Sequence, residues 1–428
     1  MKIAIIGGGI SGLSLYLFLQ KYLEEHNDLK SAVEITILEP HSLPRLHGRQ
    51  PDDIPSTGGG YGLAHNGMAS LRRLDPALHE QILRNGFPTS KFVMKSARGW
   101  TLGAMPFTDL RGNEPDCCVM VLREILIAAL YERIPTTSVI QRKVVRAEDG
   151  PEHATVELDN GEVCRYDLVI GADGVWRWVS TDFLPPPPET GPAAHGQTVM
   201  TFGPNGFFAY TPYTTGDTPA TKKHIEGEAT LPPGKNAFWW SRSAQEQPSA
   251  NPDAAVLKQE LEKRHSSWKD PTIMEIIRHS EVALKTPTFV SPKAPTWAGK
   301  RVVLIGDAAH ALPSSSGQGV SQCLEDAEAL ASLLVFNLQR FTKPESELEI
   351  LSNTFKQYMQ VRKAHVEKVL DAGNRAGDSS REMGLILEML MYAMMWAMLK
   401  FFGTFFLKTV LNYDLHAEIE KAKKSRSM

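Results

Sequence analysis

The N-terminal segment constrains the fold more than any other part of the sequence. Residues 2–6 are an apolar run rich in β-branched residues, which predicts a buried strand, and residues 7–12 follow at once with the spacing G-x-G-x-x-G. Apolar residues recur at helical spacing over 13–23, and residues 33–38 predict a second strand. Strand, glycine turn, helix and strand form a βαβ unit, which requires a parallel sheet covered by helices.

The three glycines of this turn have separate physical tasks. Gly7 permits a tight turn, Gly9 lets the backbone approach a pyrophosphate, and Gly12 lets helix and strand pack closely. The amides of Ile10 and Ser11 open the helix, where unpaired N–H groups and the helix dipole attract phosphate. The segment therefore predicts a dinucleotide site.

An acidic residue follows the second predicted strand. Glu39 is placed there to accept hydrogen bonds from an adenosine ribose. The glycine turn and this acid do not by themselves distinguish FAD from NAD.

A later glycine-rich segment favours FAD. Residues 302–305 predict a buried strand that ends at Gly306 and Asp307, whose carboxylate can bind a flexible polyol such as ribityl. Pro313 and the run Gly317-Gln318-Gly319 then precede a long helix with an apolar face. A glycine loop that enters a helix presents N–H groups and a positive dipole end, which suits the electron-rich edge of a reduced flavin.

Two further motifs identify a family. With Gly171-Ala-Asp-Gly174 and Arg123, the chain resembles the class A flavoprotein monooxygenases, the family of p-hydroxybenzoate and salicylate hydroxylases, in its fungal secondary-metabolism branch. The resemblance covers about residues 1–335. In that family the acid matching Asp173 serves FAD and nicotinamide binding, the acid matching Asp307 holds the ribityl chain, and the arginine contacts FAD.

One motif departs from the family pattern. Arg177 stands where a serine is usual after the D-G motif, and Ser180 stands where an arginine is usual. The departure concerns the nicotinamide contact, so the sequence leaves the choice between NADPH and NADH open.

The resemblance implies an α/β fold with three parts. A Rossmann-type FAD-binding domain of the glutathione-reductase-like, p-hydroxybenzoate hydroxylase fold is interrupted by a sheet-rich substrate domain, and helices follow at the C-terminus. The proline run 185–188 is the expected linker between the first two parts. The expected ranges are 1–80, 110–187 and 285–345 for the FAD-binding domain, 81–109 and 188–284 for the substrate domain, and 346–428 for the helical region.

The resemblance also implies a reaction. A nicotinamide cofactor reduces FAD, O2 forms a flavin C4a-hydroperoxide, and this species hydroxylates or epoxidises an electron-rich carbon. The expected substrate is lipophilic and aromatic or polycyclic. The protein would then be an oxidoreductase with a small-molecule substrate, without a metal.

Three residues of the predicted substrate domain are candidates for substrate contact. Tyr210 can hydrogen-bond or deprotonate a phenol, Arg242 can hold an anion, and Trp240 can pack on an aromatic ring. Alternating strand positions are expected to place Phe208, Tyr210 and Trp240 on the face toward the substrate. Ordinary packing is the alternative for each residue.

Two other functions remain open at this point. One is a flavin oxidase or dehydrogenase that inserts no oxygen. The other is a non-catalytic, lipid-handling protein on the same fold. A chain that had lost the cofactor would have no physical need for the full set of Gly7, Gly9, Gly12, Glu39, Arg123, Asp173 and Asp307.

Charge and cysteine content exclude other classes. A net charge of −3 offers no basic excess to neutralise nucleic-acid phosphates. Four cysteines without paired spacing predict neither a disulfide framework nor a zinc site. The chain opens directly on a strand, so no signal peptide is expected, and the predicted location is cytoplasmic. The protein is expected to be a monomer or a homodimer.

The segment 384–411 is dense in Leu, Met and Phe. Glu388, Lys400 and Lys408 interrupt it, so no uncharged run reaches the roughly 20 residues of a spanning helix. One hypothesis is a pair of helices packed on the main body or on a dimer partner. The other is an interfacial helix that inserts Met, Phe and Trp396 side chains into a membrane surface or guards a substrate entrance.

Overall fold

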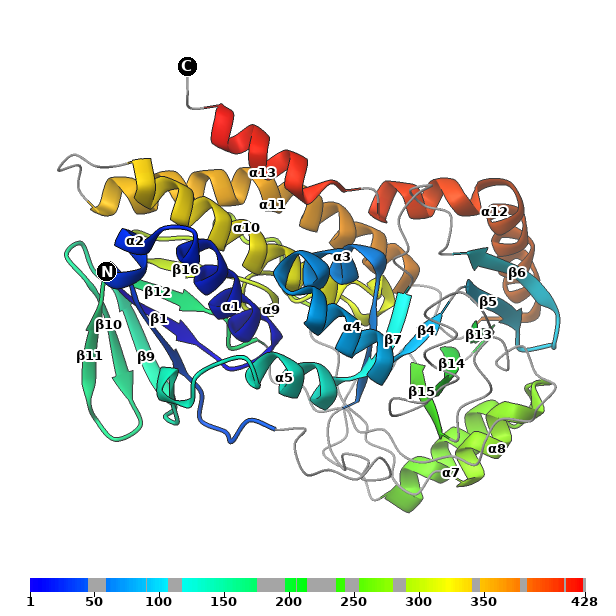
Figure 1. Ribbon diagram of the computed structural model, residues 1–428. Helices are drawn as coiled ribbons and strands as arrows, with labels where there is room; N and C mark the ends of the chain where they lie inside the picture. Colours follow the sequence, from blue (N-terminus) through cyan, green and yellow to red (C-terminus); the bar gives the residue numbers. More distant parts are fainter. Residues whose placement is uncertain are drawn as a thin grey trace.

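Figure 1 shows the computed structural model. It describes residues 1–44, 59–89, 91–106, 118–174, 197–204, 206–213, 236–242, 254–279, 290–340, 347–377, 383–411 and 413–425. The predicted proline linker at 185–188 and the departing motif at 175–180 lie outside these residues.

A five-stranded parallel sheet contains the N-terminal βαβ unit. Its strands, in spatial order, are β16 (Val302–Leu304), β12 (Leu168–Gly171), β1 (Lys2–Ile6), β2 (Glu34–Leu38) and β8 (Val139–Ile140). Both faces are apolar, as parallel sheets require. On β1, Ile3 and Ile5 pack in the helical core, whereas Ala4 packs on the other side against the residues of a second, antiparallel sheet.

Helices cover the first face and the antiparallel sheet covers the second. The helices are α1 (Ile10–Glu24) and α10 (Gly319–Arg340), which pack on each other (Figure 1). The sheet consists of β9 (Val144–Asp149), β10 (Ala154–Leu158) and β11 (Val163–Tyr166). The glycine of the turn between β10 and β11, Gly161, has φ +82°, a conformation that favours glycine.

Helix α10 is the central element of the helical layer. It is buried from Val320 to Val335 and lies against α1, α3 (His65–Leu74) and α11 (Glu347–Gly377). Because α10 has neighbours on all sides, its polar residues in this stretch are buried as well.

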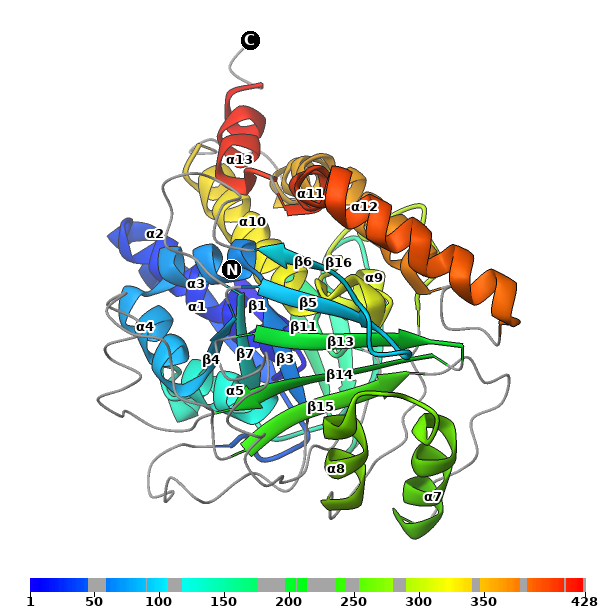
Figure 2. The ribbon, with the colours of Figure 1, turned by 90° about the vertical axis from the view of Figure 1, so that its right-hand side faces the viewer.

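A second five-stranded sheet lies beside the first body (Figure 2). Its order is β15 (Asn236–Arg242), β14 (Gly206–Tyr213), β13 (Gln197–Gly203), β5 (Lys91–Ser96) and β6 (Thr101–Pro106), and only β13 and β5 are parallel. The helices α7 (Ala254–His265) and α8 (Pro271–His279) cover one face. We call this unit the substrate sheet.

A three-stranded sheet connects the two bodies. It contains β3 (Gly60–Leu63), β7 (Cys118–Leu122) and β4 (Phe87–Thr89). Its residues Phe87, Cys118 and Met120 form a cluster with Trp240 of β15 and Phe92 of β5. The remaining elements are α2 (Asn27–Ala32), α4 (Pro76–Asn85), α5 (Arg123–Tyr131), α9 (Asp307–His310), α13 (Leu415–Lys424) and the 3-10 helices Thr136–Ser138 and Ser314–Ser316.

The apolar C-terminal segment is one continuous helix, α12 (Leu385–Leu411), rather than the expected pair of helices, and it packs on the second five-stranded sheet. The segment holds no proline, and its single internal glycine, Gly403, does not interrupt the helix. The described part of the chain has no helix that is both long and apolar enough to cross a bilayer.

Candidate active site

The N-terminal glycine turn is shaped by close packing at two positions and open at the third. Gly7 has φ +109°, and a Cβ on it would lie 2.6 Å from the carbonyl oxygen of Ala172. A Cβ on Gly12 would lie 2.0 Å from the carbonyl oxygen of Gly7. A Cβ on Gly9 would meet nothing within 4 Å, and Gly9 caps α1 without a side-chain hydrogen bond. The open position lies where a pyrophosphate would approach the amides of the helix.

Glu39 lies beside this turn. Its Oε2 accepts a hydrogen bond of 2.6 Å from the amide of Gly8, and its Oε1 accepts one of 2.9 Å from the amide of His41. The carboxylate is therefore fixed at the carboxyl end of β2, next to the amides of the glycine turn.

Asp173 follows β12 and lies against the same turn. The amide of Ala172 donates to the carbonyl of Ile6 over 2.8 Å, and the Cα of Asp173 would lie 2.7 Å from a Cβ on Gly7. Asp173 is exposed, and partial desolvation by the surrounding chain raises the pKa of its carboxyl group.

The third glycine segment meets the first two. Gly306 has φ +58°, and a Cβ on it would lie 2.2 Å from Oγ of Ser11 and 2.9 Å from Sγ of Cys323. A Cβ on Gly174 would lie 4.0 Å from Cβ of Asp307. The turn after β16 is thus in contact with the start of α1 and close to the turn after β12, so three segments far apart in the sequence converge at one edge of the sheet.

The loop before α10 also has an open side. Gly317 has φ +60°, and a Cβ on Gly317 or on Gly319 would meet nothing within 4 Å. Helix α11 holds the back of the loop, because a Cβ on Gly373 would lie 2.6 Å from Cγ of Pro313 and Oγ of Ser315 donates to the carbonyl of Gly373 over 2.7 Å. The two glycines therefore leave open space beside the N-terminus of α10.

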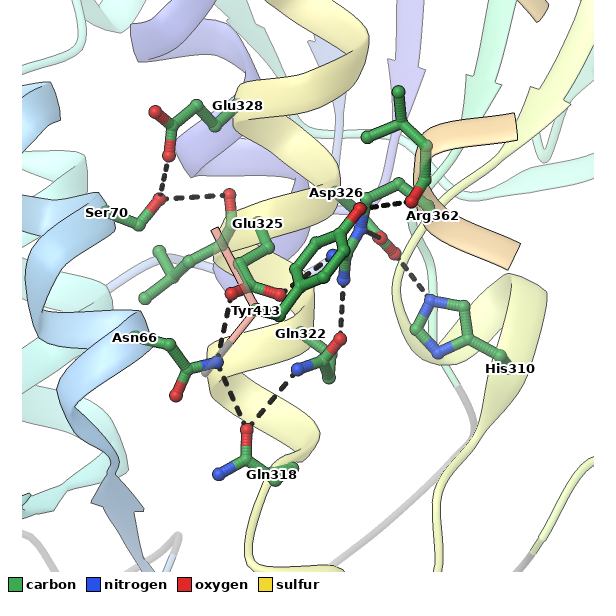
Figure 3. Close-up of polar contacts among 12 residues, drawn as sticks. Asn66, Ser70, His310, Gln318, Gln322, Glu325, Asp326, Glu328, Arg362 and Tyr413 are labelled. Atoms are coloured by element: carbon green, nitrogen blue, oxygen red, sulfur yellow. Dashed lines mark hydrogen bonds and ion pairs between the residues drawn. The ribbon is translucent and has the colours of Figure 1, made fainter. Parts of the chain in front are cut away.

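Behind this loop lies a buried polar network that the sequence analysis missed (Figure 3). Arg362 of α11 is fully buried, and its guanidinium donates to Glu325 over 2.8 Å and to Asp326 over 2.7 Å. Burial alone would lower the pKa of Arg362, but the two carboxylates raise it. Burial raises the pKa of Glu325, whereas His310 and Arg362 outweigh burial at Asp326 and bring its pKa below the ordinary value.

The network reaches both the turn after β16 and the loop before α10. Asp326 accepts hydrogen bonds from Nε2 of His310 and, over 2.9 Å, from the amide of Gly306. At the other end, the side chain of Asn66 donates to Glu325 over 3.0 Å and to Oε1 of Gln318 over 3.2 Å (Figure 3). The positions of Gly306 and Gln318 are therefore both fixed by one set of buried charges.

Arg123 is the first residue of α5 and is half-buried. Its amide donates to the carbonyl of Gly59 over 3.0 Å, which ties the start of α5 to the segment before β3.

The substrate candidates do not share one face, so the prediction that grouped Phe208 and Tyr210 with Trp240 is wrong. The register of β14 and β15 pairs Tyr210 with Trp239 and Ala209 with Trp240. Tyr210 points toward α7 and α8, is 2% exposed and donates to Asp270 over 3.2 Å. Burial, and then Asp270, raise the pKa of its hydroxyl, which opposes deprotonation of a substrate by Tyr210.

Trp240 and Arg242 lie on the opposite face of the substrate sheet. They alternate along β15, and Trp240 packs toward Met120 of the connecting sheet. This is the face directed toward the body that carries the glycine loops.

A family model described as an FAD binding domain matches residues 117–372, more than half of the chain. This chain belongs to that FAD-binding family. The match includes Asp173 and Gly174, Gly306 and Asp307, and the loop before α10, while the G-x-G-x-x-G turn lies outside the matched residues.

Curated relatives of this chain include zeaxanthin epoxidases and FAD-dependent monooxygenases. It is 25% identical to the chloroplastic zeaxanthin epoxidase of Spinacia oleracea over 86% of this chain and 52% of that protein. It is also 25% identical to the FAD-dependent monooxygenase olcE of Penicillium canescens, over 91% of this chain and 83% of that protein. The chain thus spans about half the length of the zeaxanthin epoxidases that it matches. These relatives confirm the resemblance to class A flavoprotein monooxygenases.

Solved structures share the fold. A single-residue variant of HpxO of Klebsiella pneumoniae, complexed with FAD, aligns with a TM-score of 0.71 and 17% identity over 97% of this chain and all of that one. A salicylate hydroxylase substrate complex aligns with a TM-score of 0.68 and 20% identity over 99% of this chain and 98% of that one. The predicted α/β fold is confirmed.

Proposed function

We propose that this protein is a monooxygenase that uses FAD, NADPH or NADH, and O2 to hydroxylate or epoxidise a lipophilic small molecule, acting as a monomer or a homodimer. The observation that carries the proposal is the convergence of the three glycine segments. Gly7 packs on Asp173, and Gly306 packs on Ser11, so the ends of β1, β12 and β16 meet at one edge of the parallel sheet, the edge at which folds of this kind bind dinucleotides.

The residues that we assign to FAD lie at the carboxyl ends of the parallel strands, at the start of α5, or on the loop before α10. They are Gly7, Gly9, Ile10, Ser11, Gly12, Glu39, Arg123, Asp173, Gly306, Asp307, Pro313, Gly317, Gln318 and Gly319. The geometry fits the group, because positions 9, 317 and 319 leave space where a ligand would lie. When bound, FAD supplies redox and oxygen chemistry that no side chain can perform.

The protein's own contribution is to bind, orient and exclude water. The amides at the start of α10 would stabilise negative charge on the ring of the cofactor, and the network of Arg362 would keep that helix in place. We place the substrate at the face of the substrate sheet that carries Trp240 and Arg242. Tyr210 is left out of this assignment because it faces α7 and α8.

The names of the relatives support both forms of oxygen insertion, since they include an epoxidase and a hydroxylase. The test is to supply the holoenzyme with NADPH or NADH, isotopically labelled O2 and a panel of aromatic and polycyclic compounds. A product that carries one labelled oxygen atom supports the proposal. A product that has lost hydrogen and gained no oxygen would instead identify an oxidase or dehydrogenase.

A further inference from the structure

Helix α12 is held firmly on the substrate sheet by one of its sides. Tyr392 donates to the carbonyl of Phe202 over 2.9 Å, and Glu388 accepts two hydrogen bonds, of 3.0 and 2.9 Å, from the guanidinium of Arg98. Leu399 packs closely on β6: a Cβ added to Gly103 would lie 2.9 Å from the Cβ of Leu399. These inward residues recur at helical spacing and fix the orientation of the helix.

The opposite side of α12 is apolar and exposed. The exposed fractions are 86% for Ile386, 62% for Leu390, 65% for Met394 and 65% for Phe401. Intervals of four, four and seven residues place these side chains on one side of the helix. We call these four residues the outer stripe. Further exposed apolar residues flank it: Leu385, Leu387, Trp396 and Met398. An apolar surface this continuous is unusual for a chain surrounded only by water.

The charges around the outer stripe favour an anionic partner. Between residues 385 and 401 the charged residues are Glu388 and Lys400. Glu388 is buried and neutralised by Arg98, whereas Lys400 is exposed, with its Nζ 4.7 Å from the ring centre of Trp396. An apolar strip edged by tryptophan and lysine is the pattern of helices that lie in a membrane interface.

The side-chain hydrogen bonds of α12 also favour a membrane over a protein partner. The polar side chains of Glu388 and Tyr392 are directed inward and bind Arg98 and Phe202. The outer stripe therefore offers no polar group that could set the register of a protein partner, whereas protein interfaces carry a polar, hydrogen-bonding rim. A bilayer needs no such register. Trp100, 53% exposed on the turn between β5 and β6 and packed edge-on against Tyr392, adds an aromatic side chain beside the helix.

We propose that the outer stripe of α12 docks this protein on an anionic membrane surface, with the helix lying along the interface. Docking would bring β5 and β6 of the substrate sheet next to the lipid. The proposal does not depend on the reaction that the enzyme catalyses.

The test is co-sedimentation of the full-length holoenzyme with phosphatidylcholine vesicles that contain or lack phosphatidylserine. We expect binding to the vesicles that contain phosphatidylserine, weakened by salt. The double variant Leu390→Glu/Met394→Glu should bind roughly tenfold more weakly or worse, because two side chains lose their transfer into lipid. Leu390→Gln/Met394→Gln should show most of the same loss without added charge.

A matched control lies at the other end of the molecule. Val145 on β9 and Val163 on β11 are 53% and 61% exposed, close to the values of Leu390 and Met394. Strands β9 and β11 lie at the opposite end of the molecule from α12 (Figure 1). Val145→Glu/Val163→Glu adds the same charge and should bind vesicles nearly as well as the wild type. An unchanged flavin spectrum shows that each variant is folded.

Two results would overturn the proposal. One is a wild-type protein that binds neither kind of vesicle; if it is then a dimer that Leu390→Glu/Met394→Glu converts to a monomer, the stripe is a contact between two copies. The other is an equal loss of vesicle binding in the α12 variant and in the control.

Discussion

At the residue scale, Gly9 and Gly12 of the G-x-G-x-x-G turn have different roles, one toward the ligand and one in the fold. Gly12 is required by the fold itself, because any side chain there would overlap the carbonyl oxygen of Gly7. Gly9 has ordinary backbone angles, φ −78° and ψ −174°, and open space beyond its Cα, so only a ligand would need a glycine there.

A pair of alanine variants separates these two roles. Gly12→Ala should lower the free energy of unfolding of the apoprotein by about 1–3 kcal/mol through overpacking. Gly9→Ala should change it by less than about 0.5 kcal/mol and should weaken FAD binding. Urea unfolding of the apoprotein and FAD titration measure the two effects. Equal losses of stability in both variants would contradict the assignment of Gly9 to the pyrophosphate.

Asp307 gives a second prediction at this scale. Asp307→Ala removes a carboxylate that we assign to the ribityl chain, and charged hydrogen bonds contribute about 1.5–3 kcal/mol each, so FAD affinity should fall by roughly tenfold to a hundredfold. The exposed Asp159 in the turn between β10 and β11 serves as the control, and Asp159→Ala should leave affinity unchanged. An Asp307→Ala protein that purifies with full flavin would remove this residue from the site.

The motif residues could be predicted from the sequence, whereas the buried ion network could not. The glycines and acids of the motifs were predictable because each lies next to a strand or helix that the adjacent sequence pattern predicts. Arg362, Glu325 and Asp326 were not, since adjacent acids on a helix normally indicate a solvated face. They are buried because α11 covers the side of α10 that carries them, and no local pattern gives that packing.

At the element scale, α11 and α10 are joined by a buried ion network. Buried ion pairs contribute little net stability, but loss of one partner leaves charges without compensation. Arg362→Met should therefore lower the free energy of unfolding by about 3–5 kcal/mol at neutral pH. Because Asp326 also holds the amide of Gly306, FAD affinity should fall as well.

The triple variant Arg362→Met/Glu325→Gln/Asp326→Asn should regain part of that stability, since it removes the uncompensated charges. Lys363→Met, on the same helix and partly exposed, is the control and should have little effect. Unfolding by urea measures all three. A triple variant less stable than Arg362→Met would mean that hydrogen bonding, rather than charge balance, dominates the network.

Elements also explain the wrong prediction for Tyr210. Alternation along β14 shows which residues share a face, but not which face packs on α7 and α8. Whether Tyr210 shares a face with Trp239 or with Trp240 depends on the register between β14 and β15, which pairs Tyr210 with Trp239. That register is set across a connection of more than twenty residues, 214–235, which a sequence pattern cannot measure.

At the scale of the whole molecule, stability should depend on pH through two buried histidines. Burial, followed by neighbouring cations, lowers the pKa of His265 and of His365 to about 3. The unfolded chain therefore binds more protons than the folded chain between pH 6.5 and about 3, and stability falls as pH decreases through this window. Each histidine should contribute about 1.4 kcal/mol per pH unit.

His365→Phe tests this contribution. The ring of His365 stacks on Tyr413 with 4.0 Å between centres, and phenylalanine can keep that contact without titrating. The slope of unfolding free energy against pH between 6 and 5 should decrease by about 1.4 kcal/mol per unit. An unchanged slope would show that His365 takes up its proton in the folded state.

The general architecture was predictable from the sequence because local and global signals agree: a βαβ start, an inserted run of strands and a late return to the parallel sheet. The position of α12 on the substrate sheet was not predictable, since the helix is apolar on both sides and its few polar residues, Glu388 and Tyr392, face inward rather than toward solvent.

The central claim is that three separate glycine segments form one FAD site. The most direct measurement is the visible absorption spectrum and the FAD-to-protein ratio of the purified full-length chain after incubation with FAD. We expect flavin bands and one FAD per chain. A protein that retains no flavin after this treatment would contradict the claim and would favour a fold that has lost its cofactor.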